Sequence, residues 1–210
     1  MAITYPLSLP TDIGIAEIEL RASNVVGISE SPFTYKQQVV QHQGQRWEAS
    51  ISIPAVRKDL MEPWIAFLLK LKGVYGTFLL GDPNMATPQG SAASTPGTPL
   101  IDGALSIGDS EITIDGLPLS ATGYLKAGDY IQLGSGSTAT LHKVLDDVDS
   151  DGTGEATFEI WPDVRRAVAN DETVVVSNAK GRFRLATNVT SWSINNSSAY
   201  GVAFDAVEVI

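Results

Sequence analysis

The stretch Asp147-Val148-Asp149-Ser150-Asp151-Gly152 carries oxygen ligands at alternate positions, as the first half of a calcium-binding EF-hand loop does. Its sixth residue is the glycine that the sharp turn of such a loop requires. The acid expected at the twelfth position is missing, because Phe158 stands there and Glu159 follows one place late. The stretch therefore predicts a solvated turn between two strands, with Asp147, Asp149 and Asp151 as candidate calcium ligands in the alternative interpretation.

Few other residues are suited to catalysis. The chain has no cysteine, which excludes disulfides, thiolate nucleophiles and cysteine-bound zinc. His42 and His142 are its only histidines, so the chain offers few residues from which a Ser-His-Asp triad or a multi-histidine metal centre could be built. We predict that the protein is not an enzyme and holds no cofactor besides the calcium alternative. A cell-wall hydrolase with paired carboxylates is a further alternative.

The composition narrows the class of protein. The 210 residues carry a formal net charge of −10, which argues against a protein that coats nucleic acid. The strongly apolar run at residues 64–69 is far shorter than the roughly 20 residues that span a bilayer. The N-terminus shows no secretory signal pattern. We expect a protein made in the cytoplasm, without membrane insertion and without sequence-specific nucleic-acid binding.

Alternation of apolar and polar residues predicts several strands. Trp47, Ala49, Ile51 and Ile53 alternate with polar residues, so residues 46–53 are expected to pair with residues 33–41 across a turn at 42–45. One helix is predicted over residues 56–71. Its apolar face is spaced as a helix requires and consists of Leu60, Trp64, Phe67, Leu68 and Leu71. Pro63 predicts either a kink or a later helix start.

The acidic residues are unevenly distributed along the chain. Residues 99–163 hold two bases and twelve acids, so this segment carries the whole net charge and the rest is neutral. A Pro-, Gly- and Ser-rich stretch at 81–103 precedes it and predicts a long loop or linker. We therefore predict a discontinuous first domain of residues 1–90 and 165–210, with an acidic β domain of residues 91–164 inserted into it. Its evenly spaced short strands are typical of a small barrel or sandwich.

Two further sets of residues are candidates for binding. Arg182 and Arg184 alternate on a predicted strand, where they suit a subunit contact with acidic neighbours. The tryptophans could form a sugar-binding platform, which would make the inserted domain a carbohydrate-binding module for host attachment. They are spread one per segment in apolar contexts, so we interpret them as core anchors. The tryptophans are Trp47, Trp64, Trp161 and Trp192.

Several segments together resemble the distal tail proteins of long-tailed bacteriophages and their prophages. They are Ser31-Pro32-Phe33-Thr34, Gly44-Gln45-Arg46-Trp47-Glu48-Ala49, Gly76-Thr77-Phe78-Leu79-Leu80-Gly81-Asp82-Pro83, Leu125-Lys126-Ala127-Gly128-Asp129-Tyr130, Ile160-Trp161-Pro162 and Lys180-Gly181-Arg182-Phe183-Arg184-Leu185.

The resemblance implies a mostly β protein: a β-sandwich or split-barrel ring domain with one α-helix, plus an inserted small β-barrel or β-sandwich domain. It implies a structural virion protein of the tail tip, without catalytic residues. Such a protein forms a hexameric ring that joins the tail tube protein to the hub protein of the baseplate.

Overall fold

The computed structural model describes residues 3–195 and 199–210. Within them the chain forms two β-sheets, one α-helix and three short 3-10 helices, so the mostly β class predicted from the sequence is confirmed. The helix is α1 (Lys58–Leu71) and the 3-10 helices are Gly73–Tyr75, Ser91–Ala93 and Gly136–Thr138. The strands are β1 (Glu17–Glu30), β2 (Gln37–Arg57), β3 (Phe78–Leu80), β4 (Leu100–Ile101), β5 (Glu111–Asp115), β6 (Tyr130–Leu133), β7 (Thr140–Val144), β8 (Ala156–Trp161), β9 (Val174–Val175), β10 (Gly181–Leu185), β11 (Trp192–Ile194) and β12 (Ala199–Glu208). In the described residues, no helix has the length and apolarity to cross a membrane.

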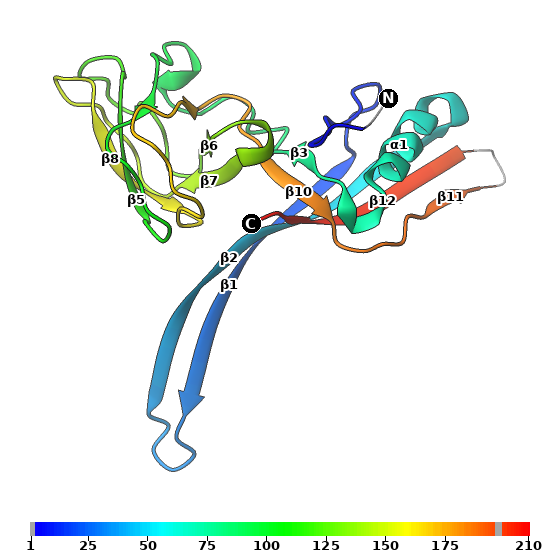
Figure 1. The fold of residues 1–210 in the computed structure, drawn as a ribbon, viewed down its shortest axis with the longest axis horizontal. Helices are drawn as coiled ribbons and strands as arrows, with labels where there is room; N and C mark the ends of the chain where they lie inside the picture. Colours follow the sequence, from blue (N-terminus) through cyan, green and yellow to red (C-terminus); the bar gives the residue numbers. More distant parts are fainter. Residues whose placement is uncertain (1–2, 196–198) are drawn as a thin grey trace.

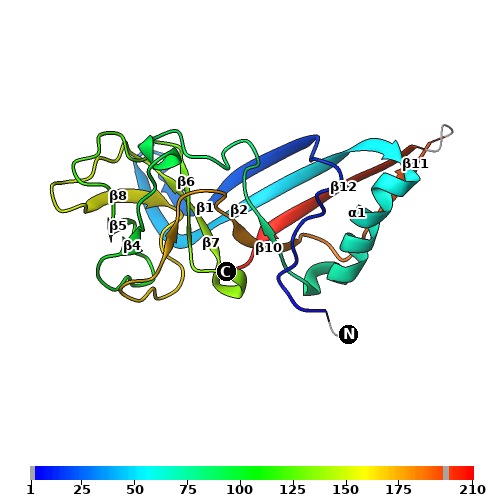
Figure 2. The same ribbon diagram turned by 90° about the horizontal axis from the view of Figure 1, so that it is seen from above.

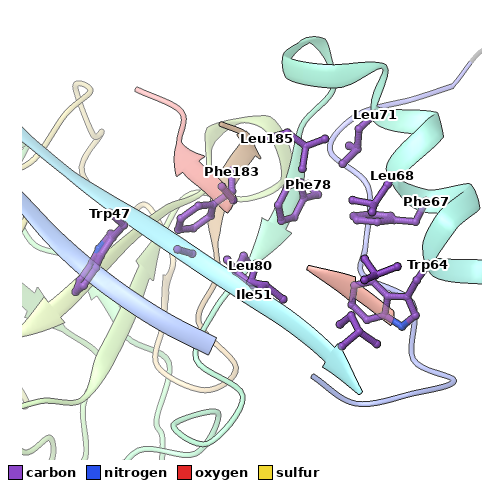
Figure 3. Close-up of a cluster of buried hydrophobic side chains, with 14 of the residues drawn as sticks. Trp47, Ile51, Trp64, Phe67, Leu68, Leu71, Phe78, Leu80, Phe183 and Leu185 are labelled. Atoms are coloured by element: carbon purple, nitrogen blue, oxygen red, sulfur yellow. The ribbon is translucent and has the colours of Figure 1, made fainter. Parts of the chain in front are cut away.

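The first sheet has the strand order β1-β2-β12-β10-β3, and β11 pairs with the far end of β12. Helix α1 covers one face of this sheet (Figures 1 and 2). The core between them is rich in aromatic side chains, with Phe67 edge to face against Phe78 at 5.5 Å between ring centroids (Figure 3). The helix and the sheet therefore each bury one apolar face against the other, as two-layer domains do.

Helix α1 keeps most of its predicted apolar face. Trp64, Phe67, Leu68 and Leu71 are buried, as their spacing predicts, and Met61 joins them. The expectation for Leu60 is wrong, because that side chain is 37% exposed. Residues 58–71 form one continuous helix around Pro63, which lies inside the helix and not in its first turn.

The predicted hairpin of residues 33–41 and 46–53 is wrong. Residues 37–57 form the single strand β2, whose antiparallel partner is β1. The turn of this hairpin spans Ser31 to Lys36, where Ser31 N–H donates to the Lys36 carbonyl (3.0 Å). Residues 42–45 contain a bulge, because the register shifts opposite Asn24 and Val26. The polar, glycine-containing stretch at residues 42–45 is thus an irregularity inside one strand and not a turn between two strands.

The second sheet has the order β4-β5-β8-β7-β6-β9 and curves into a nearly closed barrel. Its two edge strands meet at a bridge between Leu100 and Thr173. Two backbone hydrogen bonds of 3.0 Å support this closure, from Ile101 N–H to the Glu172 carbonyl and from Val174 N–H to the Pro99 carbonyl. The barrel has its own buried core, in which Ile112, Tyr124 and Leu133 are almost fully buried.

The barrel extends beyond the segment that the charges delimit. Strand β9 belongs to it, and Val168, Val174 and Val176 are buried in its core. The segment that builds the barrel therefore runs to about residue 176 and not to residue 164. The excess of acids ends earlier because Arg165 and Arg166 balance Asp171 and Glu172 in the closing segment.

The stretch before β4 packs on the barrel and is not a free linker. Ala92 is fully buried in the barrel core. Tyr124 donates its hydroxyl hydrogen to the Pro96 carbonyl (2.6 Å), and Ala92 N–H donates to the Tyr124 carbonyl (3.0 Å). Burial raises the pKa of Tyr124 to about 12, so this phenol remains a donor even at an alkaline pH at which an ordinary tyrosine ionises.

Figure 1 shows that the distal part of the β1–β2 hairpin projects well beyond the barrel and the other strands of the first sheet. We call residues 24–44, the distal part of this hairpin with its turn, the arm. Every residue of the arm is exposed except Ser31, which is half-buried. The arm therefore has no core of its own within the described chain.

Candidate interaction surfaces

The three candidate calcium ligands take separate partners. Asp147 pairs with Lys126 (Nζ–Oδ2 2.8 Å) and accepts the Ala127 N–H. Asp149 accepts the Gly123 N–H (2.5 Å). Among the described residues, no group of three or more ligating side chains that could hold a metal ion is found. Asp147 and Asp149 are thus each engaged by donors of the chain itself.

Asp151 organises the turn after this loop. It accepts the N–H groups of Thr153 and Glu155 at 2.8 and 2.9 Å. The hydrogen bonds from Glu155 and Thr153 lower the pKa of Asp151 to about 2, because they stabilise the ionised carboxylate. Its own turn thus provides the donors that a calcium ion would have to replace.

The surroundings of Asp129 do not form an open sugar platform. Asp129 is fully buried and accepts N–H groups from Gln89 and Lys126, both at 2.8 Å. The nearby rings of Tyr124 and Tyr130 are buried too. The interpretation of all four tryptophans as core anchors is wrong for Trp192, which is 42% exposed on β11, outside the barrel.

Arg182 and Arg184 lie on the face of the first sheet opposite to α1, because the intervening Phe183 points into the core. Arg184 pairs in register with Val207, and the acids Glu19 and Asp205 follow on the same face. Within the described chain neither arginine forms an ion pair, and the buried Nε of Arg182 has no hydrogen-bond partner. These two half-buried guanidinium groups therefore lack a countercharge in the described part of the chain.

A groove of about 310 Å³ lies at the acidic end of the same face. Glu17, Glu19 and Asp205 line it together with serines of β2. Asp205 accepts a hydrogen bond from the Ser50 hydroxyl (2.5 Å). This face thus carries acids at one end and arginines at the other, and such a surface is complementary to another copy of itself.

A buried polar junction joins the barrel to the first sheet. Arg165, in the barrel segment, pairs with Glu208 of β12 (Nη1–Oε2 2.6 Å), and both side chains are buried. Glu208 also accepts the Trp47 N–H (2.9 Å). Burial raises the pKa of Glu208, although Arg165 and these hydrogen bonds oppose the change.

His142 is fully buried beside this junction. Its Nδ1 lies 2.7 Å from the Pro162 carbonyl, and its Nε2 lies 2.9 Å from the Thr140 hydroxyl. Because a carbonyl oxygen only accepts, the Nδ1 carries the proton. Burial lowers the pKa of His142 to about 4, with further lowering by Arg165 and Arg166. His142 is thus a neutral structural residue at neutral pH.

No known protein-family model matches this chain, and a search of curated proteins finds no significant relative.

Proposed function

We propose that this chain is a structural subunit of a phage tail tip, where copies form a ring between the tail tube protein and the hub protein of the baseplate. The sequence resemblance points to a hexamer. In this role the protein acts by fitting surfaces together and performs no chemistry. Its place is the tip of the assembled virion tail.

The observation that carries this proposal is the amount of surface that the chain leaves unburied. Its solvent-accessible surface is 11188 Å² for a mass of 22.3 kDa. A compact monomer of this mass exposes about 9,400 Å², so the excess is roughly 1,800 Å². A standard interface buries about 800 Å² of each partner, so a ring member with two neighbours buries about 1,600 Å². The excess is thus similar in size to the surface that such a subunit would bury against its neighbours.

The charged face of the first sheet supplies specific contacts in this proposal. Arg182 and Arg184 would pair with acidic side chains of a neighbouring subunit. The double variant Arg182→Glu/Arg184→Glu should weaken assembly and reverse its dependence on salt, because it turns the charge attraction between subunits into a repulsion that salt screens. Sedimentation at low and high salt measures both effects. Arg57→Glu is a control, since Arg57 is exposed and its ion pair within the described residues is with the neighbouring Asp59.

Two measurements test the proposed function. Native mass spectrometry of the purified chain should show one closed multimer, and mass spectrometry of purified phage particles should find the chain in their tails. A chain that is absent from assembled tails, or that turns over a cell-wall or small-molecule substrate, would contradict the proposal.

A further inference from the structure

The arm presents apolar side chains on both faces. Val26, Ile28 and Val39 share one face, where Ile28 and Val39 are direct cross-strand partners, and they are 47%, 66% and 58% exposed. Val25 and Val40 are 53% and 46% exposed on the opposite face. A two-stranded ribbon without a packed face is marginally stable in water. A partner that covers the arm would stabilise it.

Both long edges of the arm are free in the described chain. Strand β1 is the outermost strand of its sheet and pairs with β2 alone. Strand β12 pairs with β2 only between Glu48 and Arg57, so the outer edge of β2 is open over residues 37–46. Backbone N–H and C=O groups along both edges are thus available for another strand.

The charge of the arm favours a partner of the same kind. Glu30 and Lys36 are its only charged residues, so the arm is neutral although the whole chain carries −10. Natural proteins commonly protect free strand edges with charged side chains, which are nearly missing here. Two arms therefore meet without the repulsion that acts between the remaining acidic parts of two copies.

We propose that the arm pairs with the arm of a second copy of this chain, the free edge of β1 in one copy lying against the free edge of β2 in the next. β1 and β2 are antiparallel within one hairpin. In copies related by rotation, with their arms side by side, β1 of one is therefore antiparallel to β2 of the next. The row formed by Ile28 and Val39 then continues from copy to copy, and such cross-strand pairs of β-branched residues stabilise sheets.

This inference shares one assumption with the proposed function, namely that copies of the chain associate with one another. The contact joins two different edges, so it is heterologous and generates a closed ring when the rotation closes. The same contact accounts for part of the excess surface described above.

Two double variants test the pairing. Ile28→Lys/Val39→Lys and Ile28→Glu/Val39→Glu each place like charges side by side between neighbouring arms, as well as across the two strands of one arm. Each variant alone should associate roughly 100-fold more weakly than the unchanged chain in sedimentation velocity, because like charges across an interface repel. An equimolar mixture of the two should recover assembly, since opposite charges then alternate along the row.

Leu119→Lys/Val189→Lys is the matched control, because both side chains are exposed outside the arm, at 68% and 79%. It should assemble like the unchanged chain. Circular dichroism should show the same fold in all variants, because the arm contributes nothing to either core.

The inference is overturned if each charged variant assembles as the unchanged chain does, or if the mixture stays dissociated. It is also overturned if the unchanged chain is monomeric at every concentration tested. None of these outcomes removes the chain from phage tails, so mass spectrometry of particles still decides the proposed function separately.

Discussion

Trp47 and Trp161 lie edge to face with their ring centroids 4.6 Å apart, and this contact joins strand β2 to the barrel. Each indole also donates its N–H across the junction. Trp47 donates to the Leu141 carbonyl (3.0 Å), and Trp161 donates to the Asn24 side chain at the base of the arm (2.9 Å). The barrel, the first sheet and the arm therefore meet at one aromatic pair, which sets the direction in which the arm projects.

The buried ion pair at this junction should be sensitive to the loss of one partner. Glu208→Gln leaves the Arg165 guanidinium buried without a countercharge, so we expect the free energy of unfolding to fall by about 3–5 kcal/mol. The double variant Arg165→Met/Glu208→Gln should be less destabilised than the sum of the single variants. Urea unfolding of the four proteins measures this coupling, and additive effects would show that the two side chains do not interact.

His142 should make the fold sensitive to acid. Its pKa is about 4 in the folded chain and about 6.5 in an unfolded one. The unfolded chain therefore binds a proton that the folded chain excludes, and stability falls as the pH drops from about 6.5 towards 4. The two pKa values correspond to a loss of about 3 kcal/mol.

His142→Asn retains a donor towards the Pro162 carbonyl but does not titrate. Its free energy of unfolding should change less than that of the unchanged chain between about pH 7 and pH 4. Urea titrations across this range measure the difference. His42→Asn is the control, because His42 lies in the exposed arm. An equal pH dependence in His142→Asn and the unchanged chain would refute the assignment.

Gly90 should not tolerate a side chain. A Cβ at this position would overlap the backbone carbonyl oxygens of Gly123 and Tyr124. Gly90→Ala should therefore destabilise the fold by about 1–3 kcal/mol, as overpacking does. Gly152→Ala is the control, since a Cβ there meets nothing within 4 Å. Thermal unfolding separates the two variants, and an equally mild effect of both would mean that residue 90 is not docked on the barrel.

Calcium should not stabilise the barrel. The carboxylates of Asp147, Asp149 and Asp151 are each occupied by donors of the chain itself. The Tm of the protein should be the same in millimolar calcium as in EDTA. The variant Asp151→Asn should have a lower Tm, because the substitution weakens the turn at Thr153. A calcium-dependent rise in Tm that Asp149→Asn abolishes would restore the calcium interpretation.

Local patterns were sufficient wherever burial follows a period along the chain. The alternation of Trp47, Ala49, Ile51 and Ile53 indicates a strand with one buried face, and all four side chains are buried. The spacing of Trp64, Phe67, Leu68 and Leu71 indicates the helix in the same way. These features depend on neighbours along the chain, because a strand repeats every two residues and a helix every 3.6.

Pairing between distant segments was decided by the tertiary structure alone. The partner strand β1 decides whether residues 42–45 form a turn or a bulge. In the same way, contacts with Leu100 and its neighbours decide whether β9 joins the barrel. The same holds for the Arg165–Glu208 pair and for the exposure of Ile28 and Val39. The sequence alone determined that this chain is mostly β and lacks thiol chemistry. Which apolar residues remain exposed depends on how distant segments compete for the same core, and this competition leaves no periodic pattern in the sequence.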